Sequence, residues 1–321
     1  MNKYTFIPVF LCIIFLVIGC EDFDIFRNSS YIEGLTIGNY PVIDGSTSTF
    51  PLNTIIACKL LGINYSWVDG PELRRVDPNL SWRNQKRLFR QVRNSQTHWS
   101  FVNLINYEAD IILSARKMSP DEEIIANEAG VTLIQTPIAL DALVFILYPY
   151  NPIQSLTTQQ IQDIYMLNIT NWDEVGGNDR KIQPYVRNAN SGSQELMELL
   201  VMKDLEMPWH PESWLELISI SGMVPAIDAV AGDNSAICYT VFYFKEHMVL
   251  NANRLVKTIA VDGIFPNIET IGNNSYPFVS EVYAVIRSDL DRSSMAYKIY
   301  EWLQTETGKQ IILESGYILS N

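Results

Sequence analysis

Two segments of the chain place hydroxyl and glycine residues where a strand passes directly into a helix. The first covers residues 44–52 (DGSTSTFPL) and the second covers residues 187–194 (RNANSGSQ). A helix N-terminus presents unpaired N–H groups and the positive end of the helix dipole, and both attract an anion. In the second segment Ser191 and Gln194 have capping-box spacing, and Gly192 lets a ligand approach the backbone. The two segments together predict a seat for a small oxyanion.

Two arginines accompany these segments. Arg187 lies four residues before Ser191, where its guanidinium can bind the same anion through two nitrogens. Ser114 and Arg116 stand at and just after the end of an apolar strand at residues 110–114. Ligands of open α/β sheets bind at this edge, so both residues are candidate contacts.

Helix capping is the simpler explanation of either segment taken alone, because Ser, Thr and Gly are preferred at helix starts. A lone arginine after a strand is also more often a solvated surface residue. Residues 97–98 open another helix, and His98 is a further candidate donor, although a lone capping histidine is more often structural. Two hydroxyl-rich helix starts in one chain, one of them beside Arg187, favour a shared ligand.

Composition disfavours several other functions. The 321 residues carry a formal net charge of -13, which disfavours a broad basic surface for nucleic acid. The three histidines at positions 98, 210 and 247 form no HxxH or HExxH motif, and no CxxC is present, so no metal or cofactor is expected. No G-x-S-x-G elbow surrounds Ser191 or Ser193, which argues against a secreted serine hydrolase. We therefore expect a protein that is not an enzyme.

The N-terminus has the pattern of a processing signal. Lys3 precedes an apolar run at residues 7–18, which is shorter than the ~20 residues of a membrane span. The following sequence VIGC is similar to a bacterial lipobox. Residues 1–19 are therefore expected to be a lipoprotein signal peptide, with the lipid on Cys20 and a tether at residues 20–36. An ordinary signal peptide or an N-terminal anchor helix is the alternative.

The remaining cysteines indicate no disulfide framework. Cys12 lies in the segment that would be cleaved, and Cys20 would carry lipid. Cys58 and Cys238 each lie in an apolar run, so we expect both to be buried small side chains.

Apolar periodicity and turn residues predict helices alternating with strands. The helices are expected at residues 50–61, 98–107, 120–130, 158–166, 193–202 and 294–314. The strands are expected at residues 40–44, 110–114, 131–136, 142–147, 183–187, 236–239 and 281–286. This alternation predicts an α/β fold with parallel sheets, and a chain of this length without a linker favours two lobes joined by crossing strands.

Six motifs make the sequence similar to a known family. They are DGSTSTFPL, ADIILSARKMSPDEE, LTTQQIQDIYMLNITNWDEVGG, RNANSGSQELM, NSYPFVSEVYAVIR and GKQIILESGYIL. The chain thereby resembles, over residues 37–319, the phosphate-binding family of periplasmic-type solute receptors, the capture components of ABC phosphate importers. The resemblance implies a type II periplasmic-binding-protein fold with a ligand cleft between two lobes. It implies one lobe at residues 37–139 plus 276–321 and the other at residues 140–275.

The resemblance also implies partners and a binding site. The ligand would be inorganic phosphate, delivered to an ABC permease by a monomer that is lipid-anchored on the extracytoplasmic face of a bacterial membrane. By position, the residues that match the family's phosphate contacts are Thr47, Ser48, Thr49, Ser114, Arg116, Arg187, Ser191, Gly192 and Ser193.

One departure from the family concerns ligand choice. Some phosphate receptors carry an aspartate in the strand-end segment that accepts the phosphate proton, whereas this chain reads Ser114-Ala115-Arg116 there. Asp44 and Asp141 are alternative acceptors, and His98 stands where relatives often carry a small hydroxyl residue. A receptor for another oxyanion, such as sulfate or molybdate, and a phosphate sensor without a transport role therefore remain alternatives.

Overall fold

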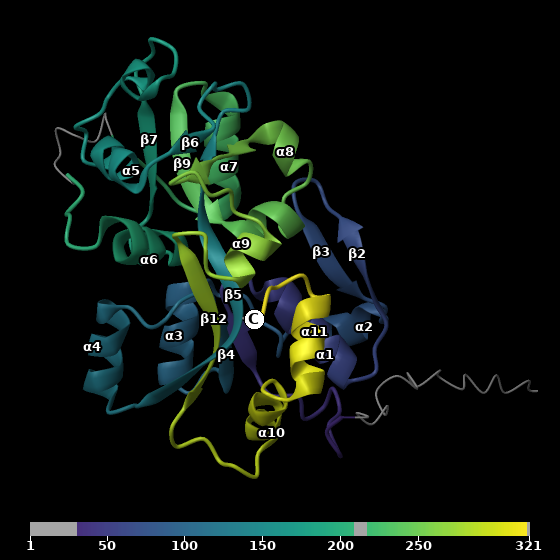
Figure 1. Ribbon diagram of the computed structural model, residues 1–321. Helices are drawn as coiled ribbons and strands as arrows, with labels where there is room; N and C mark the ends of the chain where they lie inside the picture. Colours follow the sequence, from purple (N-terminus) through teal and green to yellow (C-terminus); the bar gives the residue numbers. More distant parts are fainter. Residues whose placement is uncertain (1–30, 209–216, 320–321) are drawn as a thin grey trace, which may run out of the picture.

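An eight-stranded mixed sheet runs through the molecule in the order β1-β4-β12-β5-β9-β7-β8, with β10 paired to β5 (Figure 1). The computed structural model describes residues 31–208 and 217–319. The strands of this sheet are β1 (Ile43–Gly45), β4 (Ile111–Ser114), β5 (Leu133–Leu147), β7 (Gln183–Arg187), β8 (Ile218–Ile220), β9 (Ala236–Val241), β10 (Lys257–Thr258) and β12 (Val279–Arg287). Two small sheets pair β2 (Tyr65–Asp69) with β3 (Arg74–Pro78) and β6 (Ser155–Leu156) with β11 (Ala260–Val261).

Helices cover both halves of this sheet and divide the molecule into two lobes (Figure 1). The lower lobe in Figure 1 carries α1 (Phe50–Leu60), α2 (Trp82–Leu88), α3 (Thr97–Ile105), α4 (Pro120–Ala129), α10 (Met295–Trp302) and α11 (Glu306–Glu314). The upper lobe carries α5 (Thr158–Tyr165), α6 (Gly192–Leu196), α7 (Met223–Gly232), α8 (Ala252–Leu255) and α9 (Ile268–Gly272). Shorter turns are the 3-10 helix Trp172–Val175 and the π-helices Met197–Met202 and Phe244–Met248.

One long strand connects the lobes. β5 runs as a single strand of 15 residues, whereas the sequence predicted two strands at residues 131–136 and 142–147, so this prediction was wrong. The interruption suggested by Pro137 does not occur, because Pro137 faces Tyr283 where the pairing with β12 shifts register. A proline lacks the N–H that a regular ladder needs, and such an irregularity accommodates it.

The sheet is mixed because β5 and β12 run antiparallel to their neighbours. Within the lobes β1 pairs with β4, and β7 pairs with β8 and β9, all in parallel. β12 is antiparallel to β4 and β5, and β5 is antiparallel to β9. The expectation of parallel sheets therefore holds for the pairs β1–β4, β7–β8 and β7–β9. It fails for β12 and β5, which pair antiparallel with β4 in the lower lobe and with β9 in the upper lobe.

Local sequence signals set several helix ends as predicted. α4 begins with a capping box between Ser119 and Glu122, has Pro120 in its first turn, and ends at Gly130 with a φ of 67°. This left-handed conformation suits glycine, which has no Cβ to clash. The helix predicted at residues 294–314 is in fact two helices, because Thr305 starts a new one by accepting a hydrogen bond from the Gly308 N–H at 3.1 Å.

The β2–β3 hairpin, which was not predicted, extends from the lower lobe toward the upper one (Figure 1). At its tip Leu73 forms a β-bridge with Val249, and the Leu250 N–H donates to the Glu72 carbonyl oxygen at 3.2 Å. The lobes therefore touch at this hairpin as well as along the crossing strands.

The core confirms the expectation for two cysteines. Cys58 in α1 and Cys238 in β9 are fully buried free thiols. The predicted signal peptide and the lipid on Cys20 lie outside the described residues, as does most of the predicted tether. Within the described residues no helix is both long and apolar enough to cross a membrane.

An ionisable side chain is buried in the crossing strand. Asp141 on β5 is 1% exposed and lies opposite Ser280 of β12. Its Oδ1 accepts hydrogen bonds from the N–H groups of Ala142 and Tyr243, but its Oδ2 is buried without a partner. Burial raises the pKa of this carboxyl to about 7, while the two backbone N–H groups oppose the rise.

Substitution of Gly45 tests the pairing of β1 with β4, which holds the start of the first hydroxyl-rich segment. A Cβ on Gly45 would lie 2.4 Å from the Leu113 carbonyl oxygen, whereas a Cβ on Gly232 at the end of α7 would meet nothing within 4 Å. We expect Gly45→Ala to lower the free energy of unfolding by about 2 kcal/mol or more. Gly232→Ala should leave it unchanged or raise it by up to about 1 kcal/mol. Urea unfolding checks both, and equal effects would contradict the register of β1 on β4.

The buried carboxyl of Asp141 should make stability depend on pH. Between about pH 4 and about pH 7 the native state keeps a proton that the unfolded state has released, so the free energy of unfolding falls as pH rises. Above pH 7 this contribution levels off. Asp141→Asn stays neutral and should lose this slope, becoming the more stable protein at pH 8. Parallel stability curves for the two proteins, measured by urea unfolding from pH 4 to pH 8, would contradict the assignment.

Candidate functional site

A cavity of about 260 Å³ lies between the lobes, where loops from both lobes converge. Most of its lining comes from the segments just before or at the start of α1, α3, α6 and α7. The lining residues are Ser46, Thr47, Ser48, Gln96, Thr97, His98, Trp99, Ala115, Arg187, Asn188, Ala189, Asn190, Ser191, Gly192, Ser193, Gly222, Met223 and Val241. A cavity at the start of several helices is electrostatically suited to an anion.

Hydroxyl groups tie the lower wall of the cavity together. The Ser46 hydroxyl accepts a hydrogen bond from the Ala115 N–H at 3.0 Å and shares one with the Thr97 hydroxyl at 2.9 Å. These contacts join the ends of β1 and β4 to the start of α3. Thr47 and Ser48 of the first hydroxyl-rich segment follow Ser46 and also line the cavity.

The starts of α3 and α7 lack side-chain caps. Gln96 precedes α3 with a φ of 69° and Gly222 precedes α7 with a φ of 92°, and neither helix has a side-chain capping hydrogen bond. Sequence reasoning missed the contribution of Gly222 and Met223. The signal was present, because small residues separate strand β8 from an apolar helix there, as in the two segments that were recognised. The cavity therefore offers backbone donors from more helices than the sequence indicated.

Arg187 supplies the buried positive charge. It ends β7 with 2% exposure, its Nε donates to the Ile220 carbonyl oxygen at 3.2 Å, and its Nη1 is buried without a hydrogen-bond partner. No carboxylate of the described residues forms an ion pair with it. Burial lowers the pKa of this guanidinium. An unpaired buried charge is strongly unfavourable, so this one calls for an anionic ligand.

The segment after Arg187 brings the upper lobe against the lower one. Ser191, Gly192 and Ser193 all line the cavity, and the Ser191 hydroxyl accepts from the Gln194 N–H at 3.2 Å. A Cβ on Gly192 would lie 2.7 Å from the Thr97 hydroxyl oxygen, so glycine is required for this approach. The capping pair at residues 191 and 194 is therefore real and borders the cavity.

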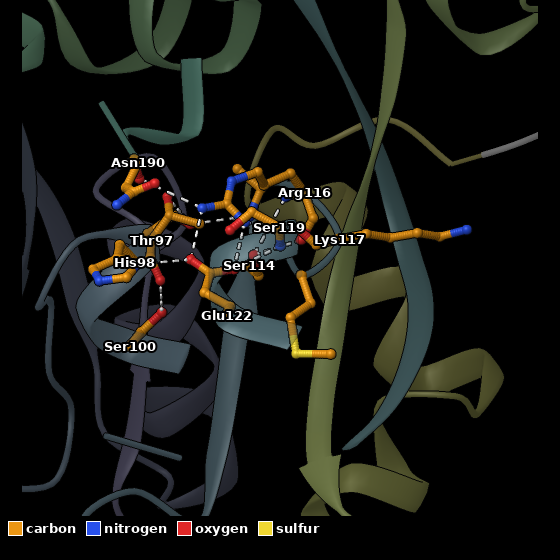
Figure 2. Close-up of polar contacts among 12 residues, drawn as sticks. Thr97, His98, Ser100, Ser114, Arg116, Lys117, Ser119, Glu122 and Asn190 are labelled. Atoms are coloured by element: carbon orange, nitrogen blue, oxygen red, sulfur yellow. Dashed lines mark hydrogen bonds and ion pairs between the residues drawn. The ribbon is translucent and has the colours of Figure 1, made fainter. Parts of the chain in front are cut away.

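Three of the predicted contact residues, Thr49, Ser114 and Arg116, do not line the cavity, and their side chains bond to other protein groups. The Thr49 hydroxyl donates to the carbonyl oxygens of Ser46 and Leu113 at 2.9 and 2.7 Å. The Ser114 hydroxyl donates to the Arg116 carbonyl oxygen at 2.6 Å. The Arg116 guanidinium makes a two-pronged ion pair with Glu122 at 2.7 and 2.8 Å (Figure 2). None of the three lines the cavity.

Arg116 also connects the two lobes through a hydrogen bond. One of its nitrogens, Nη2, donates to the Asn190 carbonyl oxygen at 3.4 Å, and Asn190 belongs to the segment that follows β7 (Figure 2). Arg116 is 3% exposed and lies over the ring of Phe101. Its position supports a role in holding the segment that precedes α6.

The two aspartates considered as proton acceptors are also outside the lining. The carboxylate of Asp44 accepts hydrogen bonds from the N–H groups of Gly45 and Ser95 at 2.8 and 2.9 Å and from Asn103 Nδ2 at 2.8 Å. Asp141 lies within β5, away from the cavity wall. His98, by contrast, does line the cavity. Within the described ranges, no three His, Cys, Asp or Glu side chains are grouped to hold a metal ion.

Comparisons with known proteins agree with this architecture. Residues 90–305 match a family described as the PBP superfamily domain. The phosphate-binding protein PstS of Borreliella burgdorferi is 26% identical over 216 residues, which cover 67% of this chain and 74% of that protein. Protein SphX of Synechococcus elongatus is 20% identical over 287 residues, covering 86% of this chain and 76% of that protein.

Solved structures share the fold. A protein of Clostridium perfringens with bound phosphate has 24% identity and a TM-score of 0.63, covering 88% of this chain and 100% of that one. An ABC-type phosphate transport receptor of Vibrio cholerae has 23% identity and a TM-score of 0.60, covering 87% and 99%. These matches confirm the two-lobed α/β fold and the resemblance that the sequence motifs predicted. Because the family match covers more than half of the residues of this chain, the chain belongs to the PBP superfamily.

Proposed function

We propose that this chain is an extracytoplasmic solute-binding protein that captures inorganic phosphate between its lobes and delivers it to an ABC permease. The observation that carries the proposal is the buried Nη1 of Arg187, which has no partner in a cavity lined by hydroxyl groups and helix starts. A tetrahedral oxyanion would neutralise the guanidinium and accept hydrogen bonds from several directions. Phosphate is favoured because relatives of similar length are named as phosphate-binding proteins.

The proposed contacts come from both lobes. Thr47 and Ser48 bind from the lower lobe, and Arg187 with residues 191–193 binds from the upper lobe. Each hydrogen bond to a charged group contributes about 1.5–3 kcal/mol. About six such bonds offset the ~4–15 kcal/mol that association costs. The site therefore supports micromolar or tighter binding, roughly -8 kcal/mol or more.

Thr49, Ser114 and Arg116 act as supports in this proposal. Their hydrogen bonds hold the loop before α1, the end of β4 and the segment before α6 in place. A substrate that makes contacts in both lobes stabilises their closed arrangement. One lobe consists of residues 37–139 plus 276–321 and the other of residues 140–275, joined at the crossing strands.

Attachment to a membrane completes the proposal. Residues 1–19 are a lipoprotein signal peptide, Cys20 carries the lipid, and residues 20–36 form a tether. The protein works as a monomer on the extracytoplasmic face, without a cofactor or catalytic step. Its relatives in the family are substrate-binding proteins, which supports the role of receptor over that of enzyme.

A receptor for sulfate is the second candidate. The strand-end segment carries Ala115 at the cavity wall, and a methyl group cannot accept the hydrogen bond that a protonated oxyanion donates. Sulfate donates no such hydrogen bond, so it would bind without an acceptor at this point.

The buried guanidinium gives the direct test of the site. We expect Arg187→Ala to weaken phosphate binding at least about tenfold, because the variant loses both charge neutralisation and a two-nitrogen contact. Isothermal titration of protein stripped of ligand by mild unfolding measures the affinity. Arg90→Ala, which removes an exposed arginine outside the cavity lining, is the control and should bind as the wild type does. An unchanged affinity in Arg187→Ala would refute the assignment.

A further inference from the structure

His98 occupies the cavity wall with one ring nitrogen fixed by a buried carboxylate. Its Nδ1 lies 3.1 Å from Glu122 Oε1, and the two side chains are 18% and 0% exposed (Figure 2). His98 lies in the first turn of α3, beside Thr97, whose hydroxyl is bonded to Ser46. The imidazole therefore sits between the cavity and a buried polar cluster.

Glu122 can only accept hydrogen bonds from this cluster. Both of its oxygens accept hydrogen bonds from the Arg116 guanidinium, and Oε2 also accepts one from the Ser119 N–H at 2.8 Å. A carboxylate paired with arginine has no proton to donate. The hydrogen between His98 and Glu122 must therefore belong to Nδ1 of the imidazole. A carboxylate on one ring nitrogen sets the tautomer of a histidine in this way.

This tautomer leaves a lone pair on the other side of the ring. In the neutral imidazole with a proton on Nδ1, Nε2 is an acceptor. Nε2 has no hydrogen-bond partner among the described residues, and it lies on the opposite edge of the ring from Glu122. The backbone N–H groups at the helix starts and the Arg187 guanidinium can only donate, and the hydroxyls and side-chain amides of the lining can do either. His98 is thus a fixed acceptor in a site rich in donors.

The other candidate acceptors do not fill this role. The oxygens of Asp44 already accept from Gly45, Ser95 and Asn103. Asp141 does not line the cavity. No aspartate or glutamate of the described residues lines the cavity, so His98 has no competing carboxylate acceptor in the lining.

We propose that His98 Nε2 accepts the hydrogen bond of a protonated oxyanion and thereby selects phosphate against sulfate, with Glu122 and Arg116 as positioning residues. The inference rests on the proposed function. Phosphate keeps at least one proton at neutral pH, and this O–H group donates a hydrogen bond to Nε2 while the proton stays on the phosphate oxygen. Sulfate has no proton, so its oxygen would face the Nε2 lone pair, and this repulsion excludes it.

Two substitutions at one position separate an acceptor from a donor. His98→Gln keeps a side-chain oxygen within reach of the Nε2 position, whereas His98→Lys offers donors only. We expect the wild type and His98→Gln to favour phosphate and arsenate over sulfate and selenate. In His98→Lys the ratio of phosphate to sulfate affinity should fall at least about tenfold. The ratio cancels the general effect of the added charge. An unchanged ratio in a folded His98→Lys protein would overturn the inference.

A spectroscopic measurement on the wild type does not depend on the folding of any variant. Nitrogen NMR of the imidazoles reports which ring nitrogen carries the proton, and His98→Gln identifies the signal among the three histidines. We expect the Nδ1–H tautomer in the free protein and a shift of Nε2 on addition of phosphate but not of sulfate. An Nε2–H tautomer, or an Nε2 chemical shift that does not change on addition of phosphate, would overturn the inference.

Isothermal titration of the wild type distinguishes the two levels of the proposal. Absence of phosphate binding by the wild type would overturn the proposed function and this inference with it. Tight phosphate binding by the wild type, combined with an unchanged affinity ratio in His98→Lys, would leave the function standing and remove His98 as its selectivity residue.

Discussion

The guanidinium of Arg187 is buried at the end of β7, and no carboxylate of the described residues neutralises it. A charge in this position is costly unless something else supplies the opposite sign. The Ile220 carbonyl oxygen accepts a hydrogen bond from Nε of Arg187, whereas Nη1 is buried without a partner. The uncapped starts of α3 and α7 add partial positive charge beside it. The cavity is thereby prepared for an anion before any anion arrives.

The same contacts that shape the cavity also hold the lobes together. Gly192 approaches Thr97, Arg116 donates to the Asn190 carbonyl oxygen, and the β2–β3 hairpin touches Val249 and Leu250 on another side of the interface. Two of these contacts, at Gly192 and at Asn190, belong to the segment that lines the cavity. In the proposed function, β5 and β12 are the elements about which the lobes would move.

Much of this could be predicted from residue patterns because the signals are local. A capping box with proline and a terminal glycine predicted α4, and the two hydroxyl-rich helix starts lie on the two sides of the same cavity. The choice between a ligand and a protein group as the bonding partner was harder to predict. Arg116 and Ser114 lie at the expected strand end, but the Arg116 guanidinium pairs with Glu122 and the Ser114 hydroxyl donates to a backbone carbonyl oxygen. The continuity of β5 depends on a register shift in its partner strand, and no local signal reports such a shift.

The central claim is that Arg187 and the surrounding helix starts bind a tetrahedral oxyanion. Crystals grown with arsenate test it most directly, since arsenic scatters anomalously and mimics phosphate in shape and protonation. The account predicts one strong anomalous peak in the interlobe cavity, within hydrogen-bond distance of Arg187 Nη1 and of the segments at residues 46–48 and 191–193. An empty cavity at saturating arsenate, or a peak only on the outer surface, would contradict it.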